Sequence, residues 1–282
     1  MRWLTAAAVA ATALLAALHW EEVRDAFLAV PPATFGAAVV LHAATLVLRS
    51  EAWRLVLAAV AAEPLPRRAV HAANAGAFLA GIAQSHATLP VRLGLLARLR
   101  PGAVRAAHIV LADVPILAVE IGCTCLLLAG AALAQGLWWL AAAALASAAA
   151  VPLGARLLHL RFVHRPIAGG LTVLADTRLR VVLAALLAAV TLTGAVRVWV
   201  LMSATGLPGS LPAAAMVFVS LGVFGLLPLG PSASPAGTVA VLGASGVGSA
   251  LVLGFAVSAT SICAVLVYSV MVAAAFTVRS RR

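Results

Sequence analysis

Long apolar runs bounded by arginines are the feature that most constrains this sequence. Residues 249–278 and 181–202 form two such runs, and each reaches the ~20 residues that a helix needs to cross a bilayer. Only 10% of the 282 residues are charged and 64% are hydrophobic, so the chain cannot cover a water-facing surface. The sequence therefore predicts an all-α polytopic membrane protein, which excludes a soluble enzyme and a disordered chain.

The charge balance indicates which side of the membrane each loop faces. All 19 basic residues are arginines, against eight acidic residues, for a net charge of +11. Sixteen of the 19 arginines fall in or near predicted cytoplasmic segments, the exceptions being Arg24, Arg92 and Arg197. The positive-inside rule explains this distribution, and these arginines attract anionic lipid headgroups. We therefore expect no nucleic-acid partner.

The order of the apolar runs predicts about six full membrane spans and two re-entrant helical hairpins. The first run follows Arg2 and is interpreted as a retained span, with a signal anchor as the alternative. The charged segment after Arg49 is interpreted as the point where the second span leaves the bilayer. The six predicted spans are residues 3–18, 33–50, 106–134, 137–153, 181–202 and 249–278.

Two further apolar stretches are predicted to enter the membrane and turn back. Residues 69–89 lie between two arginine clusters, and a turn at Leu89-Pro90 keeps both clusters on one side. Residues 213–248 are broken by a Pro/Gly/Ser-rich tip at 227–237, which leaves arms of about 15 and 11 residues, too short to cross.

The hairpins enter from opposite faces in this topology, and both termini lie in the cytoplasm at the cell membrane. The chain is then one transmembrane domain, residues 1–282, whose first repeat is 33–134 and whose second, inverted repeat is 180–278. Interrupted hydrophobic segments at matching places in inverted halves predict a transport site near the midplane.

Arg92 is the main candidate for binding a substrate, because it lies two residues beyond the predicted turn in Leu89-Pro90-Val91-Arg92-Leu93-Gly94. A guanidinium held inside the bilayer is costly, and a lipid phosphate matches its planar set of donors. Pro90 and Gly94 are expected to shape this turn. The alternative is a shallow hairpin from which Arg92 snorkels to the surface.

Asp113 and Glu120 are the carboxylate candidates. Seven residues correspond to 700° of helix, so both side chains share one face within about 20°. Glu120 falls near mid-bilayer and is expected to be functional, either paired with an arginine at a hairpin tip or protonated. For Asp113 the favoured alternative is an N-cap, because Val114-Pro115 suits a first helical turn.

The second half of the chain supplies three more candidates. Arg197 either snorkels or faces the second hairpin as Arg92 serves the first. Ser232 and Ser234 are expected to present hydroxyl and backbone N–H groups to a headgroup at the start of a half-helix. Neither metal spacing, a nucleotide loop nor a nucleophile with its base is recognisable, so we expect no metal, no cofactor and no enzyme activity.

Three short motifs resemble the membrane region of the lysylphosphatidylglycerol synthase/flippase family. They are Arg49…Trp53-Arg54-Leu55, Leu89-Pro90-x-Arg92-x-Gly94…Arg98, and Leu227-Pro228…Ser234-Pro235-x-Gly237 before a final span. The resemblance covers most of the chain from the second span onward. It implies a polytopic lipid flippase or lipid-linked transport fold, often coupled to cell-envelope or glycolipid synthesis.

The chain departs from the family pattern at two acidic positions. Leu95 stands where the family usually has Glu, and Val239, Ala240 and Val241 stand where a second Glu usually follows the proline-glycine turn. We expect a flippase-like transporter of an anionic phospholipid or a polyprenyl-phosphate-linked lipid. The alternative is a non-transporting membrane partner that anchors a cell-envelope glycosyltransferase.

Overall fold

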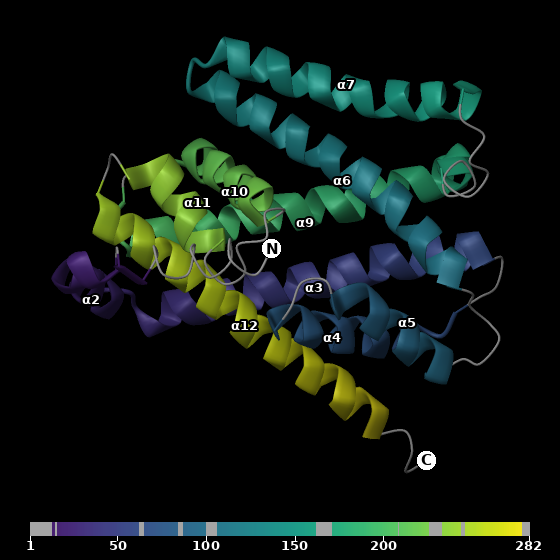
Figure 1. Ribbon diagram of the computed structural model, residues 1–282, viewed down its shortest axis with the longest axis horizontal. Coiled ribbons are helices and arrows are strands. Elements are labelled where there is room, and N and C mark those ends of the chain that lie inside the picture. The colour runs from purple at the N-terminus through teal and green to yellow at the C-terminus, as the bar shows by residue number, and fades with distance from the viewer. Residues whose placement is uncertain are drawn as a thin grey trace. The chain divides into compact units, whose positions relative to one another are not determined.

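The computed structural model of the protein is built from helices. It describes residues 13–14, 16–61, 65–83, 87–99, 106–161, 171–207, 209–225, 233–243 and 246–277. Every regular element in these ranges is a helix (Figure 1), which confirms the all-α prediction. The predicted first span lies mostly outside the described residues.

Four helices in the described ranges are long and apolar enough to cross a bilayer. They contain 28 to 31 residues, so at 1.5 Å per residue each exceeds a hydrocarbon core of about 30 Å. The protein is therefore membrane-embedded. The four helices are α3 (Pro32–Ala61), α6 (Ala106–Ala134), α9 (Thr177–Ala204) and α12 (Val247–Thr277).

The end of α6 follows from its sequence. Gly136 adopts φ +73°, a left-handed conformation that glycine reaches without strain. The Leu137 N–H then donates to the Ala132 carbonyl at 2.8 Å, which satisfies a terminal carbonyl as in a Schellman motif. The chain enters α7 (Trp138–Arg161) directly afterwards, so the predicted break between the apolar runs 106–134 and 137–153 is confirmed.

Two boundaries differ from the sequence-based predictions. Asp113 is not an N-cap, because α6 begins seven residues earlier at Ala106 and continues through Pro115. The helix α3 does not end near Ser50 but continues to Ala61. The reason is that Glu51 and Arg54, interpreted as a charged interface, pair with each other on the helix at 2.9 Å and need no water to neutralise them.

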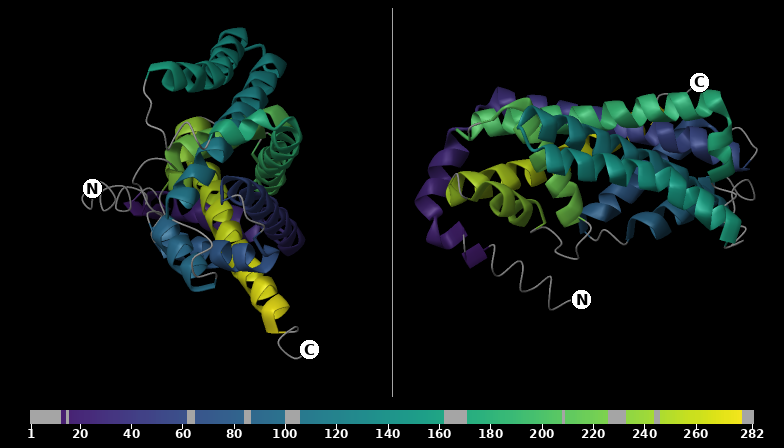
Figure 2. Two further views of the ribbon diagram at one scale, coloured as in Figure 1. Left: turned by 90° about the vertical axis from the view of Figure 1, so that its right-hand side faces the viewer. Right: turned by 90° about the horizontal axis from the view of Figure 1, so that it is seen from above.

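Two pairs of shorter helices accompany the long ones. The helix α4 (Arg67–Ala83) packs against α5 (Thr88–Leu99), and α10 (Leu211–Gly225) packs against α11 (Ala233–Leu242), as Figure 1 and Figure 2 show. These pairs occupy the places of the two predicted hairpins.

The predicted turn positions need correction. Leu89-Pro90 lies inside the first turn of α5 rather than at a tip. Of the predicted second tip, residues 227–232 lie outside the described residues, and residues 233–237 belong to the start of α11. A proline is tolerated there because the first N–H groups of a helix have no intrahelical acceptor. Arg92 is consequently one turn inside α5.

The described chain divides into two compact units. Unit 1 comprises residues 1–42, 130–138 and 193–264, and unit 2 comprises 43–129, 139–192 and 265–282. Both units take residues from each predicted repeat. The short helix α2 (Trp20–Leu28) belongs to unit 1 and the 3₁₀ turn η2 (Val173–Ala175) to unit 2.

Each unit has its own hydrophobic core. In unit 2, Trp53, Leu57, Leu96, Ile109 and Leu183 are almost fully buried together. In unit 1, the core gathers side chains of α9, α10 and α12, among them Leu201, Met202, Val217 and Leu253.

Candidate functional site

A cavity of about 650 Å³ in unit 2 brings together three of the four charged residues that the sequence singled out, Arg92, Asp113 and Glu120. We call it the polar cavity. The helices α3, α4, α5 and α6 all contribute to its wall. Its charged and polar side chains are Arg49, Trp53, Asn74, Thr88, Arg92, Asp113 and Glu120.

Arg92 is held at this wall by two partners. Its Nη1 donates to Asp113 Oδ1 at 3.1 Å, and its Cζ lies 4.6 Å from the centre of the Trp53 ring, within the range of a cation–π interaction. Trp53 Nε1 donates to the same Asp113 oxygen at 3.0 Å. The three side chains thus fix one another, and the Arg92 side chain is only 12% exposed.

Glu120 pairs with a different arginine. Arg49 Nη2 lies 2.7 Å from Glu120 Oε2, so an ion pair joins α3 to α6. Both α6 carboxylates face the same cavity, as their seven-residue spacing predicts. The polar cavity therefore holds two cations and two anions arranged as two ion pairs.

The guanidinium of Arg92 is incompletely used. Its Nε is buried and has no hydrogen-bond acceptor among the described residues. The Oδ1 atom of Asn74 is also buried, and no described residue donates a hydrogen bond to it. A buried donor without a partner costs on the order of 1–3 kcal/mol. The site can offset that cost by binding a polar ligand that supplies an acceptor.

Pro90 and Gly94 do not line the polar cavity. Both residues are exposed on α5, and a side chain at Gly94 would meet nothing within 4 Å. Their places are explained by helix geometry, with Pro90 in the first turn and Gly94 on the outer face.

Unit 1 holds the remaining candidates in less polar surroundings. Arg197 is 6% exposed and donates from Nη1 to Ser261 Oγ at 3.0 Å, so its side chain stays inside the unit. The sequence predicted that Arg197 either snorkels to the membrane surface or faces the second hairpin. It did not predict the hydrogen bond to Ser261 of α12. The Ser234 carbonyl accepts the Thr238 hydroxyl at 3.1 Å, and Ser232 lies outside the described residues.

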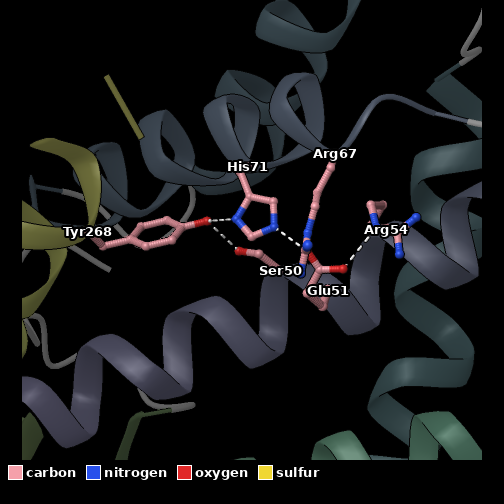
Figure 3. A network of polar contacts seen from close by, with 6 residues as sticks. All are labelled: Ser50, Glu51, Arg54, Arg67, His71 and Tyr268. Atoms are coloured by element: carbon pink, nitrogen blue, oxygen red, sulfur yellow. Dashed lines mark hydrogen bonds and ion pairs between the residues drawn. The ribbon is translucent and has the colours of Figure 1, made fainter. Parts of the chain in front are cut away.

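Unit 2 contains a second polar network, which the sequence did not predict (Figure 3). Glu51 accepts hydrogen bonds from Arg54 Nε at 2.9 Å and from Arg67 Nε, and its Oε1 lies 2.5 Å from His71 Nε2. His71 Nδ1 lies 2.8 Å from the Tyr268 hydroxyl, which donates to Ser50 Oγ at 2.8 Å.

This network ties α3, α4 and α12 together through one carboxylate. Glu51 and Tyr268 are 8% and 1% exposed, so the contacts are largely shielded from water. The available sequence signal was His71 in an otherwise apolar stretch; its partners are up to 197 residues away and leave no local pattern. Within the described ranges, no group of three or more His, Cys, Asp or Glu side chains is placed to hold a metal ion.

Comparison with family models, with curated proteins and with solved structures found no match. The resemblance to the flippase family therefore stays a prediction based on the short motifs.

Proposed function

We propose that this chain is a flippase-like transporter that moves an anionic phospholipid or a polyprenyl-phosphate-linked lipid between the leaflets of the cell membrane. The observation that carries the proposal is Arg92, a mostly buried guanidinium that faces a cavity and has an unused Nε donor. A phosphate accepts two parallel hydrogen bonds from such a planar group.

The ion pairs of the polar cavity support a mechanism of partner exchange. Arg92 contacts Asp113 through a single hydrogen bond of 3.1 Å among the described contacts, and the Asp113 side chain is 45% exposed, so the carboxylate has room to move away. A phosphate then takes the place of Asp113 on the guanidinium. The Arg49–Glu120 pair beside it offers a second guanidinium for the headgroup as the lipid moves.

We further propose that α4 with α5 and α10 with α11 are the two re-entrant hairpins of an inverted repeat. The four helices contain 17, 12, 15 and 10 residues, which is short of a full crossing. Pro90 and Pro235 are each the third residue of the second helix of their pair. With α7 (Trp138–Arg161) and the apolar run 3–18 as the two further spans, this arrangement gives about six spans and cytoplasmic termini.

Reconstitution tests transport directly. The purified chain is placed in liposomes that contain fluorescent phosphatidylglycerol, and dithionite then bleaches the outer leaflet. We expect the inner-leaflet fraction to become accessible faster than in protein-free liposomes. A rate equal to that of protein-free liposomes for phosphatidylglycerol and for a polyprenyl phosphate would overturn the proposal.

Variants of Arg92 test the role of the site. Arg92→Ala should slow flipping about 100-fold, because two charge-assisted hydrogen bonds are worth roughly 3 kcal/mol. Arg92→Lys should recover only part of the rate, because lysine lacks the bidentate fork. Arg98→Ala is the matched control, since Arg98 is exposed in the last turn of the same helix. Equal loss at both positions would contradict a phosphate site at Arg92.

A further inference from the structure

A second cavity in unit 2, of about 530 Å³, lies along the last turns of α12. We call it the α12 groove. It is separate from the polar cavity, because no residue lines both. One wall comes from α12 and the other from α3 and the start of α4.

The two ends of the α12 groove differ in chemistry. Val47, Met271, Val272 and Ala275 supply an apolar wall, whereas Arg67, Arg68 and His71 supply a basic edge. Met271 is 58% exposed, so the apolar wall is open to whatever surrounds the protein. In a membrane-embedded protein that surrounding is lipid.

The basic edge carries a surplus of positive charge. Glu51 is its one carboxylate among the described residues, and it faces Arg54 and Arg67. Arg68 lines the groove and forms no ion pair with any residue in the described ranges.

The edge is also held in place before any ligand arrives. Glu51 fixes Arg67 through its Nε, which leaves the terminal guanidinium nitrogens on a side chain that is 69% exposed. Ser50, Tyr268 and His71 form the hydrogen-bonded chain that supports Glu51 from behind (Figure 3). Preorganised donors bind more tightly because less side-chain freedom is lost.

We propose that the α12 groove binds an anionic phospholipid, with the phosphate between Arg67 and Arg68 and an acyl chain along Met271, Val272 and Ala275. The basic edge selects the negative headgroup, and the apolar wall requires a chain rather than a free anion. This lipid site is distinct from the transport site proposed above, and it exists whether or not the polar cavity transports.

The test is lipid binding to the full-length protein, delipidated in detergent and followed by native mass spectrometry. The measurement uses the Arg92→Ala background, which removes the main guanidinium proposed to bind phosphate in the polar cavity. We expect phosphatidylglycerol to bind at least about tenfold more tightly than phosphatidylcholine, since one charge-assisted hydrogen bond of about 1.4 kcal/mol corresponds to that factor. Equal affinity for the two lipids would overturn the proposal.

Two variants locate the site. The double variant Arg67→Gln/Arg68→Gln should weaken phosphatidylglycerol binding at least about tenfold, and Ala275→Trp, which fills the apolar wall, should do the same without any change of charge. Arg54→Gln is the matched control, because Arg54 also pairs with Glu51 but does not line the groove. It should bind within about twofold of its parent. Loss in Arg54→Gln equal to that in the double variant would refute the assignment.

Glycerol phosphate separates a lipid site from an anion site. It carries a phosphate but no acyl chain, so its affinity should be at least about tenfold lower than that of phosphatidylglycerol. Equal affinity would show that the apolar wall is not used and would contradict a lipid site. None of these outcomes depends on flipping, so failure here leaves the transport proposal standing, and failure of transport leaves the α12 groove untouched.

Discussion

The helix pairs α4–α5 in unit 2 and α10–α11 in unit 1 share a construction but differ in polarity. Each consists of two short helices with a proline as third residue of the second helix. In unit 2, Arg67 and Arg92 project from the pair to carboxylates on α3 and α6. In unit 1, the hydroxyls of Ser220 and Thr238 bond back to carbonyls one turn earlier in their own helices.

The difference in polarity indicates that the two units have different roles. Unit 2 concentrates the described ion pairs that link different helices, together with both cavities. Unit 1 instead brings backbones into close contact, because a Cβ at Gly254 of α12 would lie 2.4 Å from Pro235 Cα of α11. We infer that unit 2 carries recognition of charge and unit 1 carries rigid packing.

The largest expected effect is on Glu51 in unit 2. Glu51→Gln removes the negative charge that faces Arg54, Arg67 and His71, and breaking a buried ion pair in this way costs about 3 kcal/mol. The loss should appear as a lower midpoint of unfolding in mixed detergent micelles.

Glu120→Gln provides the comparison within the same unit. Glu120 has one described ion-pair partner, Arg49, whose side chain is 45% exposed, and such an exposed pair contributes less than about 1 kcal/mol. If Glu51→Gln lowers the unfolding midpoint no more than Glu120→Gln does, the Glu51 network does not stabilise the protein more than an exposed ion pair.

The second effect concerns close packing. Gly254→Ala should destabilise the protein by about 2 kcal/mol, because the new Cβ meets the Pro235 backbone, which cannot turn aside. Gly76→Ala in unit 2 should cost less than about 1 kcal/mol, since its Cβ meets only the tip of the Leu95 side chain, at 2.3 Å. Thermal unfolding of both variants measures the difference, and a larger loss at Gly76 would reverse the comparison.

The smallest effect is expected at Arg197. Its only hydrogen-bond partner among the described residues is Ser261, and its Nε is buried without an acceptor. Arg197→Met replaces a buried charge by an apolar chain of similar length, so stability should stay within about 1 kcal/mol of the parent or rise. If the free energy of unfolding falls by more than about 2 kcal/mol, Arg197 must have a stabilising partner other than Ser261.

Much of the fold was accessible from the sequence. The predicted runs 181–202 and 249–278 match α9 and α12 to within a few residues, and the run 106–134 matches α6 at both ends. These boundaries follow from local causes, chiefly the length of an apolar segment and a glycine such as Gly136 at its end. The proline positions were interpreted as turns, because in sequence a proline inside the first turn of a helix cannot be distinguished from a proline at the turn of a hairpin.

The candidate site was accessible only in part. The spacing of Asp113 and Glu120 placed them on one face, and an arginine in an apolar context marked Arg92. The partner of each carboxylate was not accessible, because Trp53 lies 60 positions from Asp113 and Arg49 lies 71 from Glu120. Helical periodicity carries no information about such distant pairs.

The sequence by itself determined that the chain is embedded in a membrane, where three of its four long helices begin and end, and which charges lie in apolar surroundings. Each of these follows from the composition and period of a segment taken alone. The tertiary structure decided which charges meet, so Glu51 changed from an interfacial residue into the centre of a buried network. The reason is that neutralisation of a buried charge depends on the few ångströms between side chains of different helices, and only packing sets those distances.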